Sequence, residues 1–399
     1  MNGIKYQSRL LDYIIYVFLC FYLIVDSVAG ILITMGFPNI GQLYKILIVI
    51  FMLVHIALQK YKSFFSISFL FSLLLLIILN SFFIFFSSLS QSLLIVFKII
   101  CGYIFYVYFI DYSDTSSIDK IMKINYIVFV LNILIGILGF GRSTYSEGME
   151  EGIGTTGFFY AGNEVSYTFI CLSFWFISNF RNKKIWAYIV TILLSIFIGT
   201  KACMLAALLL CFNDIIYSVR PKKRKYVLLL IIIFSIILCI CVSIFMTNHP
   251  LYKYISSKLK QQSVGDYPIL NALLSGRITQ LFEATNLYME NFSFNNFLFG
   301  MGYPGHLKRI EMDFFEIYLY FGIFLLVFEV FFYISLLYKA YACKDKKLFM
   351  FNLICIFLSF LAGHIVYSLM GGVFFAILNA RNIGKKQIQE KIIYEQRIN

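Results

Sequence analysis

Cationic and acidic side chains gather in one polar stretch of this otherwise apolar chain, from Thr247 to Asp313. Guanidinium and ammonium groups suit a phosphate or diphosphate, arginine by two-pronged hydrogen bonding and lysine as a point charge. A carboxylate or a histidine beside such cations can serve as a general base. The candidates in this stretch are Arg277, His306, Lys308, Arg309, Glu311 and Asp313, and Lys201 in a turn between two apolar runs joins them.

These residues fall into two groups by the chemistry they could do. The candidate diphosphate ligands are Lys201, Arg277, Lys308 and Arg309, and the candidate catalytic residues are Arg277, Arg309, Glu311, Asp313 and His306. A plainer interpretation also stands for each of them. The cations could anchor helix ends at lipid headgroups, the two carboxylates could form structural ion pairs, and the histidine could be a solvated loop residue.

Several other kinds of site are excluded by their missing motifs. The chain has no G-x-x-x-x-G-K-[ST] loop for ATP, no H-E-x-x-H or Cys-x-x-Cys pair for zinc, and no G-x-S-x-G nucleophile turn. Its four histidines are dispersed, and eight of its nine cysteines lie in apolar runs, where they act as small hydrophobic residues. The sequence therefore predicts no metal and no cofactor.

The elements that must position these residues are membrane helices. Apolar residues make up 61% of the chain and charged residues 13%, whereas soluble domains carry about 25% charged residues. The apolar runs are continuous and near the length that a hydrocarbon core of roughly 30 Å requires. We predict an all-α polytopic membrane helix bundle in a single domain, residues 1–399. Its twelve spans are 11–35, 43–59, 64–86, 91–110, 123–140, 163–180, 185–200, 202–218, 226–246, 314–338, 348–362 and 364–380.

The positions of lysine and arginine fix the predicted orientation. Basic residues cluster in alternate short segments between the apolar runs, including residues 181–184, 220–225 and 339–347. Cytoplasmic loops carry this excess, so both termini are predicted to be cytoplasmic and residues 247–313 to form one large extracytoplasmic loop. The formal charge of +13 is explained by this pattern, and nucleic-acid binding is not expected because no basic stripe lies on a foldable soluble unit.

The outward segments carry three further predictions. The glycine-rich residues 141–163 look like a mobile loop. Apolar residues after Arg277 recur at helical spacing and predict an amphipathic helix along the membrane surface, or a short helix packed on its own loop. The glycines between residues 300 and 305 predict a tight turn whose N–H groups can approach a ligand. Charges inside the spans, at Asp26, Lys98 and Glu329, are costly in lipid and often functional.

Four segments give the chain a resemblance to a known family. They are GFFYAGNEVSY (157–167), GTKACMLAAL (199–208), SGRITQLFEA (275–284) and FGMGYPGH (299–306), the last followed by EMDFFEIYLYFG (311–322). Together they resemble the Wzy-type O-antigen and capsular polysaccharide polymerases of the O-antigen ligase-like superfamily. The chain departs from the family at Lys201, where arginine is usual, and ligases carry His-Asn where this chain has Glu311-Met312. The second departure favours a polymerase over a ligase.

The resemblance implies an enzyme, a glycosyltransferase at the outer face of the bacterial cytoplasmic membrane. Glycan on undecaprenyl diphosphate would be transferred onto a lipid-linked repeat unit, with a flippase and a chain-length regulator as partners. Two alternatives stay open. A glycan ligase of the same superfamily would attach finished polymer to another acceptor. A lipid-linked oligosaccharide flippase or other transporter would show short loops on both faces and polar residues at mid-span.

Overall fold

The computed structural model describes most of the chain outside the stretch around residues 219–275. The described residues are 2–59, 61–84, 89–110, 115–145, 153–180, 184–218, 226, 229, 274, 276–305, 310–361, 363, 365 and 367–381. Most of the predicted span 226–246 and most of the stretch before Arg277 lie outside them, as do His306, Lys308 and Arg309.

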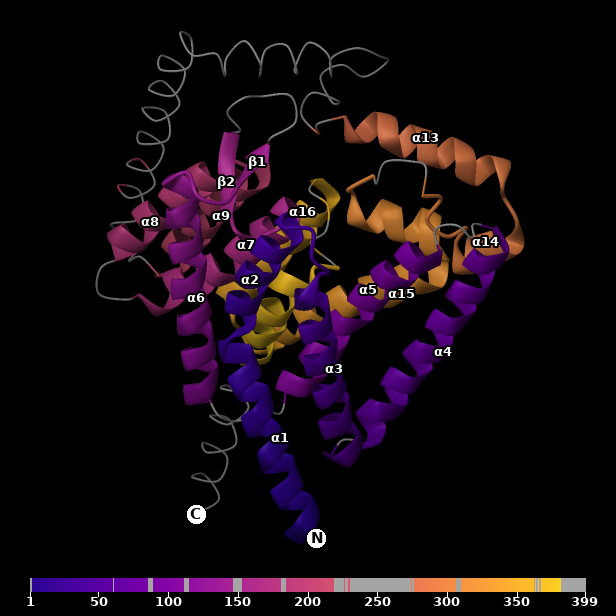
Figure 1. The fold of residues 1–399 in the computed structure, drawn as a ribbon, viewed down its shortest axis with the longest axis horizontal. Coiled ribbons are helices and arrows are strands. Elements are labelled where there is room, and N and C mark those ends of the chain that lie inside the picture. Colours follow the sequence, from indigo (N-terminus) through magenta and orange to yellow (C-terminus); the bar gives the residue numbers. More distant parts are fainter. Residues whose placement is uncertain are drawn as a thin grey trace.

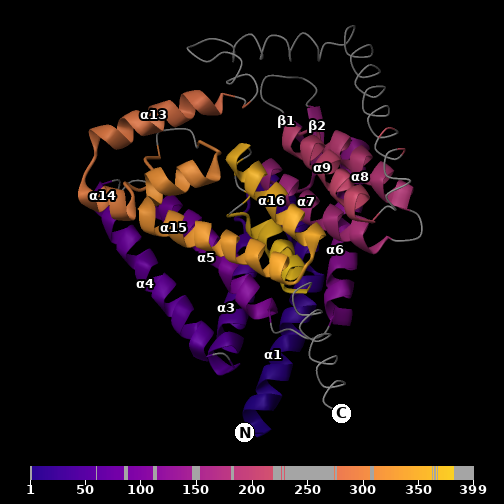
Figure 2. The ribbon, with the colours of Figure 1, turned by 180° about the vertical axis from the view of Figure 1, so that it is seen from behind.

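Helices dominate the described residues because an apolar chain in lipid must pair its backbone groups internally. The two views in Figures 1 and 2 show α13, β1 and β2 at the end of the molecule opposite the start of α1. The elements are α1 (Asn2–Cys20), α2 (Tyr22–Thr34), α3 (Ile40–Gln59), α4 (Tyr61–Ile84), α5 (Leu89–Phe109), α6 (Thr115–Ile137), β1 (Arg142–Tyr145), β2 (Ile153–Gly157), α7 (Gly162–Asn179), α8 (Lys184–Ile198), α9 (Lys201–Ser218), α13 (Arg277–Glu290), α14 (Phe294–Phe299), α15 (Asp313–Ala342), α16 (Lys346–Leu361) and a last helix, Leu369–Arg381.

Five of the described helices are long and apolar enough to cross a membrane, or six if the bent pair α1–α2 counts as one span. Each predicted span apart from 226–246 coincides with a helix or a helix pair. Large apolar side chains such as Leu43 and Phe331, 65% and 66% exposed, lie on the outer surface of these helices. An apolar helix bundle of this kind is what the composition predicts.

The first predicted span is broken at Phe21, where α1 and α2 meet at 51°. A break leaves backbone groups without intrahelical partners, and the buried amide of Asn125 in α6 supplies them. Its Nδ2 donates to the carbonyl of Leu19 at 2.8 Å, and its Oδ1 accepts from the N–H of Leu23 at 3.0 Å. One polar side chain thus fixes both the bend and the packing of α6 against it.

The described parts of the glycine-rich segment, residues 141–145 and 153–163, contain two strands, which the expectation of a loop did not include. Strands β1 and β2 pair antiparallel, and the amide of Asn132 in α6 holds the second strand through the carbonyl of Thr156 and the N–H of Phe158, each at 3.0 Å. A Cβ on Gly136 would lie 2.1 Å from Thr155 Oγ1. Glycine therefore lets the hairpin pack directly on α6.

Ion pairs tie the helices together at the end remote from the hairpin. The carboxylate of Asp214, near the end of α9, lies 2.5 Å from Lys184 Nζ at the start of α8 and 2.6 Å from Lys347 Nζ at the start of α16. Arg381, at the end of the last helix, lies 2.7 Å from Asp119 in α6. That helix begins at Leu369 rather than at residue 364, because the preceding residues pack against the site described next.

Candidate functional site

Arg277 is the first residue of α13, as the sequence predicted, and it joins three elements. Gly276 precedes it with a left-handed φ of 81°. One terminal nitrogen of the guanidinium donates to the carbonyl of Leu361 at the end of α16, and the other lies 2.8 Å from Glu311 Oε2 just before α15. The buried Nε has no hydrogen-bond partner among the described residues. Arginine offers five N–H donors, so this guanidinium retains a donor for a further oxygen.

Glu311 is held in an unusual backbone conformation beside Arg277. Its φ is 54°, a region that non-glycine residues rarely adopt and that is found mostly where surrounding structure enforces it. Gly363 is part of that surrounding structure, because a Cβ there would lie 2.5 Å from both Cα and Cβ of Glu311. The side chain of Glu311 is 36% exposed, so its carboxylate is open to solvent while its backbone is fixed.

Asp313 begins α15 and is fully buried, with 0% exposure. Its Oδ2 accepts the N–H of Ile365 at 2.8 Å. The carboxylate therefore anchors the non-helical segment between α16 and the last helix to the start of α15. Of the two predicted carboxylates, Glu311 is the one that solvent reaches.

Lys201 is placed by a turn between α8 and α9. Gly199 has a φ of 77°, and Thr200 caps α9 by accepting the N–H of Cys203 at 3.1 Å. The hydroxyls of Thr200 and Ser166 are 3.0 Å apart, which ties the start of α9 to the start of α7. Lys201 is exposed and close enough to Arg277 for the two charges to interact.

The glycine turn, residues 300–305, is as tight as predicted, but its first N–H groups do not face a ligand. The N–H of Met301 donates to the carbonyl of Leu319 at 3.4 Å, and that of Gly302 to the carbonyl of Tyr320 at 2.8 Å. These carbonyls are available because α15 is kinked at Gly322, which has a φ of 79° and a ψ of 178°. The expectation of a ligand-binding turn was wrong for these two N–H groups.

Gly300 and Gly322 make the contact between the turn and the kink. A Cβ on Gly300 would lie 2.2 Å from the carbonyl oxygen of Tyr320, and one on Gly322 would lie 2.4 Å from the nitrogen of Gly300. Two backbones thus touch without a side chain between them. This contact holds the glycine turn against α15 at its kink.

The charges predicted inside the spans are paired or buried. Lys45 Nζ lies 2.8 Å from Asp26 Oδ1, and Lys98 Nζ lies 2.6 Å from Glu164 Oε1. Glu329 is 3% exposed in α15. The sequence pointed to Asp26 and Lys98 but not to their partners, because Lys45 and Glu164 stand close to helix starts, where a charge is unremarkable.

The structure thus brings Lys201, Arg277 and Glu311 to one end of the bundle, with Asp313 buried behind them. Sequence reasoning missed Leu361 and Gly363, since a backbone carbonyl and a glycine near a helix end carry no chemical signature. Within the described residues, no group of three His, Cys, Asp or Glu side chains could hold a metal ion. Two cations beside an exposed carboxylate suit an anionic group and a hydroxyl that loses its proton.

Comparison of the chain with protein-family models, curated proteins and solved structures gives no match. The resemblance to the polysaccharide polymerases therefore stays a prediction, carried by the four segments in which it was found.

Proposed function

We propose that this chain is a polysaccharide polymerase of the bacterial cytoplasmic membrane, built from about twelve spans with both termini cytoplasmic and one large extracytoplasmic loop, residues 247–313. It transfers glycan from undecaprenyl diphosphate onto a lipid-linked repeat unit at the outer face. A flippase supplies the substrate and a chain-length regulator acts on the product. Neither a nucleotide nor a metal is needed, because the lipid diphosphate is already an activated donor.

The observation that carries this proposal is the contact between Arg277 and Glu311. It joins α13, which lies within the polar stretch 247–313, to the segment just before α15, and Lys201 adds a second positive charge nearby. A cation pair at a helix start favours a diphosphate, and an exposed carboxylate alongside favours proton removal from a hydroxyl. Lys308 and Arg309 precede Glu311 closely in sequence and would add to the positive charge.

An apolar groove beside these residues supports a lipid-linked substrate. It has a volume of about 520 Å³ and lies between α14, the first half of α15 and the end of α16. Phe314 is next to Asp313 in the chain, and Phe360 is next to Leu361, whose carbonyl binds Arg277. A polyprenyl chain in this groove would leave its diphosphate near the cations.

The cations and the carboxylates of the site would take different parts in the reaction. The acceptor hydroxyl oxygen forms a bond to the anomeric carbon of the donor, and the bond from that carbon to the diphosphate oxygen breaks. Undecaprenyl diphosphate leaves with the electron pair, and Arg277, Lys201 and Arg309 stabilise the charge that develops on it. The hydroxyl proton passes to Glu311, while Asp313 holds the segment around Ile365. His306 is the alternative proton acceptor.

One observation favours a transporter as the second candidate. The ion pairs Asp26–Lys45 and Lys98–Glu164 line a polar cavity among the helices, and such groups mark substrate or ion pathways in transporters. A ligase of the same superfamily is the third candidate, and the sequence Glu311-Met312 stands against it.

Deletion of the gene distinguishes the three candidate functions, polymerase, ligase and flippase. Loss of a polymerase leaves single repeat units attached to the final acceptor, and a plasmid copy restores the ladder of longer products on a gel. Long polymer that stays on the lipid carrier would identify a ligase. Repeat units that stay on the cytoplasmic face, inaccessible to an externally added glycosidase, would identify a flippase. Either of the last two outcomes, or an unchanged ladder, rejects the polymerase.

A further inference from the structure

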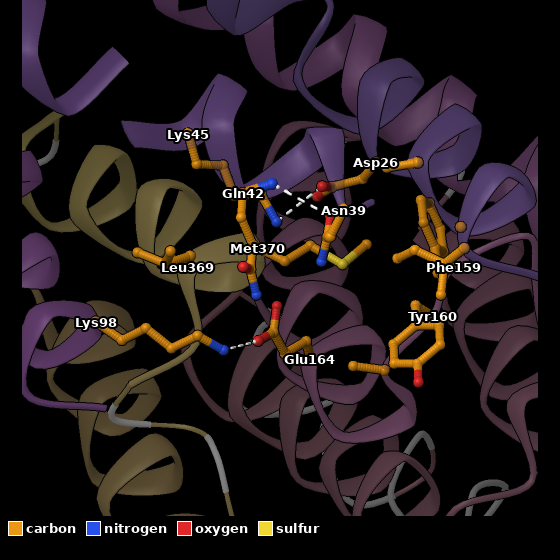
Figure 3. A pocket seen from close by; sticks show the side chains of 14 residues that line it. Asp26, Asn39, Gln42, Lys45, Lys98, Phe159, Tyr160, Glu164, Leu369 and Met370 are labelled. Atoms are coloured by element: carbon orange, nitrogen blue, oxygen red, sulfur yellow. Dashed lines mark hydrogen bonds and ion pairs between the residues drawn. The ribbon is translucent and has the colours of Figure 1, made fainter. Parts of the chain in front are cut away.

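A polar cavity, which we call the ion-pair cavity, lies apart from Arg277 among α2, α3, α5, α7 and the last helix. Its volume is about 210 Å³. Figure 3 shows Lys98 and Glu164 on one side of it and Asp26 on the other, with Met370 between them. Asp26 pairs with Lys45 at 2.8 Å and Lys98 with Glu164 at 2.6 Å. These two cations and two carboxylates leave the wall without net charge, so it does not select an anion such as a diphosphate.

One atom of this wall needs a partner. Asp26 Oδ2 is buried, in a side chain that is only 10% exposed, and it accepts no hydrogen bond from any residue that the structure describes. Buried carboxylate oxygens are nearly always hydrogen-bonded, and an exception calls for an explanation such as a ligand or an ordered water. The side-chain amides of Asn39 and Gln42 also line the cavity. The wall therefore offers an acceptor and two amide groups to a ligand that carries hydroxyls.

Another part of the wall is apolar and aromatic. Phe159, Tyr160 and Met370 line it, and Figure 3 shows the two rings on the same side. The ring of Tyr160 is 53% exposed, and the guanidinium carbon of Arg142 lies 4.3 Å from its centroid. Apolar surface with a few placed polar groups is typical of small-ligand sites. A sugar ring matches this mixture, since it carries hydroxyls on its rim and C–H groups on its faces.

The cavity is connected to the Arg277 site through one segment of the chain. Leu361 and Gly363 contact Arg277 and Glu311, and this segment leads directly into the last helix, whose first residues Leu369 and Met370 line the cavity. A ligand that moves Leu369 and Met370 would therefore affect both the cavity and the Arg277 site.

We propose that the ion-pair cavity binds one neutral sugar ring of the lipid-linked glycan, with a ring hydroxyl donating to Asp26 Oδ2. The choice of a glycan sugar rests on the proposed function. The cavity is a subsite for the carbohydrate part of the substrate, separate from the cations that hold its diphosphate.

Saturation-transfer NMR on the full-length chain in phospholipid nanodiscs tests this directly, since no sugar-based detergent is present. The probes are neutral hexoses, deoxyhexoses and N-acetylhexosamines at millimolar concentration. The substitution Ile33→Phe places a ring into the cavity, which Ile33 lines. Val28→Phe is the matched control, because Val28 is on the same helix but 44% exposed. Gln42→Ala removes one amide without adding bulk, and thermal unfolding confirms that each variant is folded.

We expect at least one sugar to bind the wild-type chain and Val28→Phe equally. Binding should weaken about tenfold or more in both cavity variants. In Gln42→Ala the cause is the loss of one good polar contact, and in Ile33→Phe it is the ring that fills the cavity. The proposal is overturned if no sugar binds, if binding survives both substitutions, or if inorganic diphosphate displaces the sugar. The gene-deletion result is independent: sugar binding with an unchanged ladder would reject the polymerase and keep the sugar site.

Discussion

Replacing Arg277 by alanine separates catalysis from stability at the candidate site. The substitution removes the ion pair with Glu311 and the hydrogen bond to the carbonyl of Leu361. It also removes the unpartnered Nε donor. If the guanidinium stabilises the departing diphosphate, polymer elongation should fall much further than the amount of folded protein does.

The expected loss of folding stability is small compared with the expected loss of reaction rate. The side chain of Glu311 is 36% exposed, so solvent screens the ion pair and it contributes about 0.5–1 kcal/mol. Removal of the donor to the carbonyl of Leu361 costs about 1 kcal/mol of folding stability. A total of about 2 kcal/mol leaves a protein of ordinary stability folded. Loss of one preorganised charge from a transition state costs a factor of about 10²–10³ in rate.

Arg381 provides the matched control at the other end of the bundle. It too pairs with a partly exposed carboxylate, that of Asp119, at 2.7 Å, and it too has a buried Nε without a partner. Arg381→Ala should therefore destabilise the chain by a similar amount and leave the rate per folded molecule unchanged.

The assay measures elongation of lipid-linked repeat units by the purified variants, with initial rates normalised to folded protein. We expect a loss of about 10²-fold or more for Arg277→Ala. In cells, the same variant should leave single repeat units in place of the ladder, as the gene deletion does. A rate within tenfold of wild type, or an equal loss in Arg381→Ala, would refute the assignment of Arg277 to the diphosphate.

Two further substitutions test neighbouring parts of the reasoning. Glu311→Gln keeps the shape of the side chain but removes the base. The elongation rate should therefore fall by a factor of about 10²–10⁴, while binding of the lipid-linked substrate is retained. An unchanged rate would assign the base to His306 instead. Gly322→Ala places a Cβ 2.4 Å from the nitrogen of Gly300 at a φ of 79°, so it should destabilise the chain by about 3 kcal/mol in chemical unfolding. Gly102→Ala is its control, since a Cβ there meets no atom within 4 Å, and an equal loss in both would contradict the close backbone contact.

The helices were predictable because their signal is local. Continuous apolar runs and residues at helical spacing after Arg277 indicated helices, and α13 begins at that residue. The candidate residues could be chosen by residue type, since arginine can bind a diphosphate and glutamate can accept a proton. The contact between Arg277 and Glu311 was left open, as was that between Lys98 and Glu164, because pairs far apart in sequence depend on how helices pack.

Glycines and amides account for most of what sequence reasoning missed. Gly363 and Gly322 act only through the absence of a Cβ, which has meaning once the opposing backbone is known. Asn125 looks like one polar residue in an apolar run, yet its amide forms hydrogen bonds with backbone groups on both sides of the break between α1 and α2. The glycine-rich segment 141–163 was predicted to be a loop because glycine favours loops, and its described residues include two paired strands that contact α6.

The ion pair at the site also suggests an order of events in the proposed reaction. While Glu311 is paired with Arg277, its Oε2 accepts a hydrogen bond from the guanidinium. A diphosphate carries more charge than one carboxylate and offers several oxygens, so it competes for the same guanidinium and can use the free Nε as well. Once displaced, Glu311 cannot move far, because Gly363 packs against its Cα and Cβ. Binding of the donor would thus release Glu311 from Arg277 beside the bond that must form, which links proton removal to occupancy of the diphosphate site.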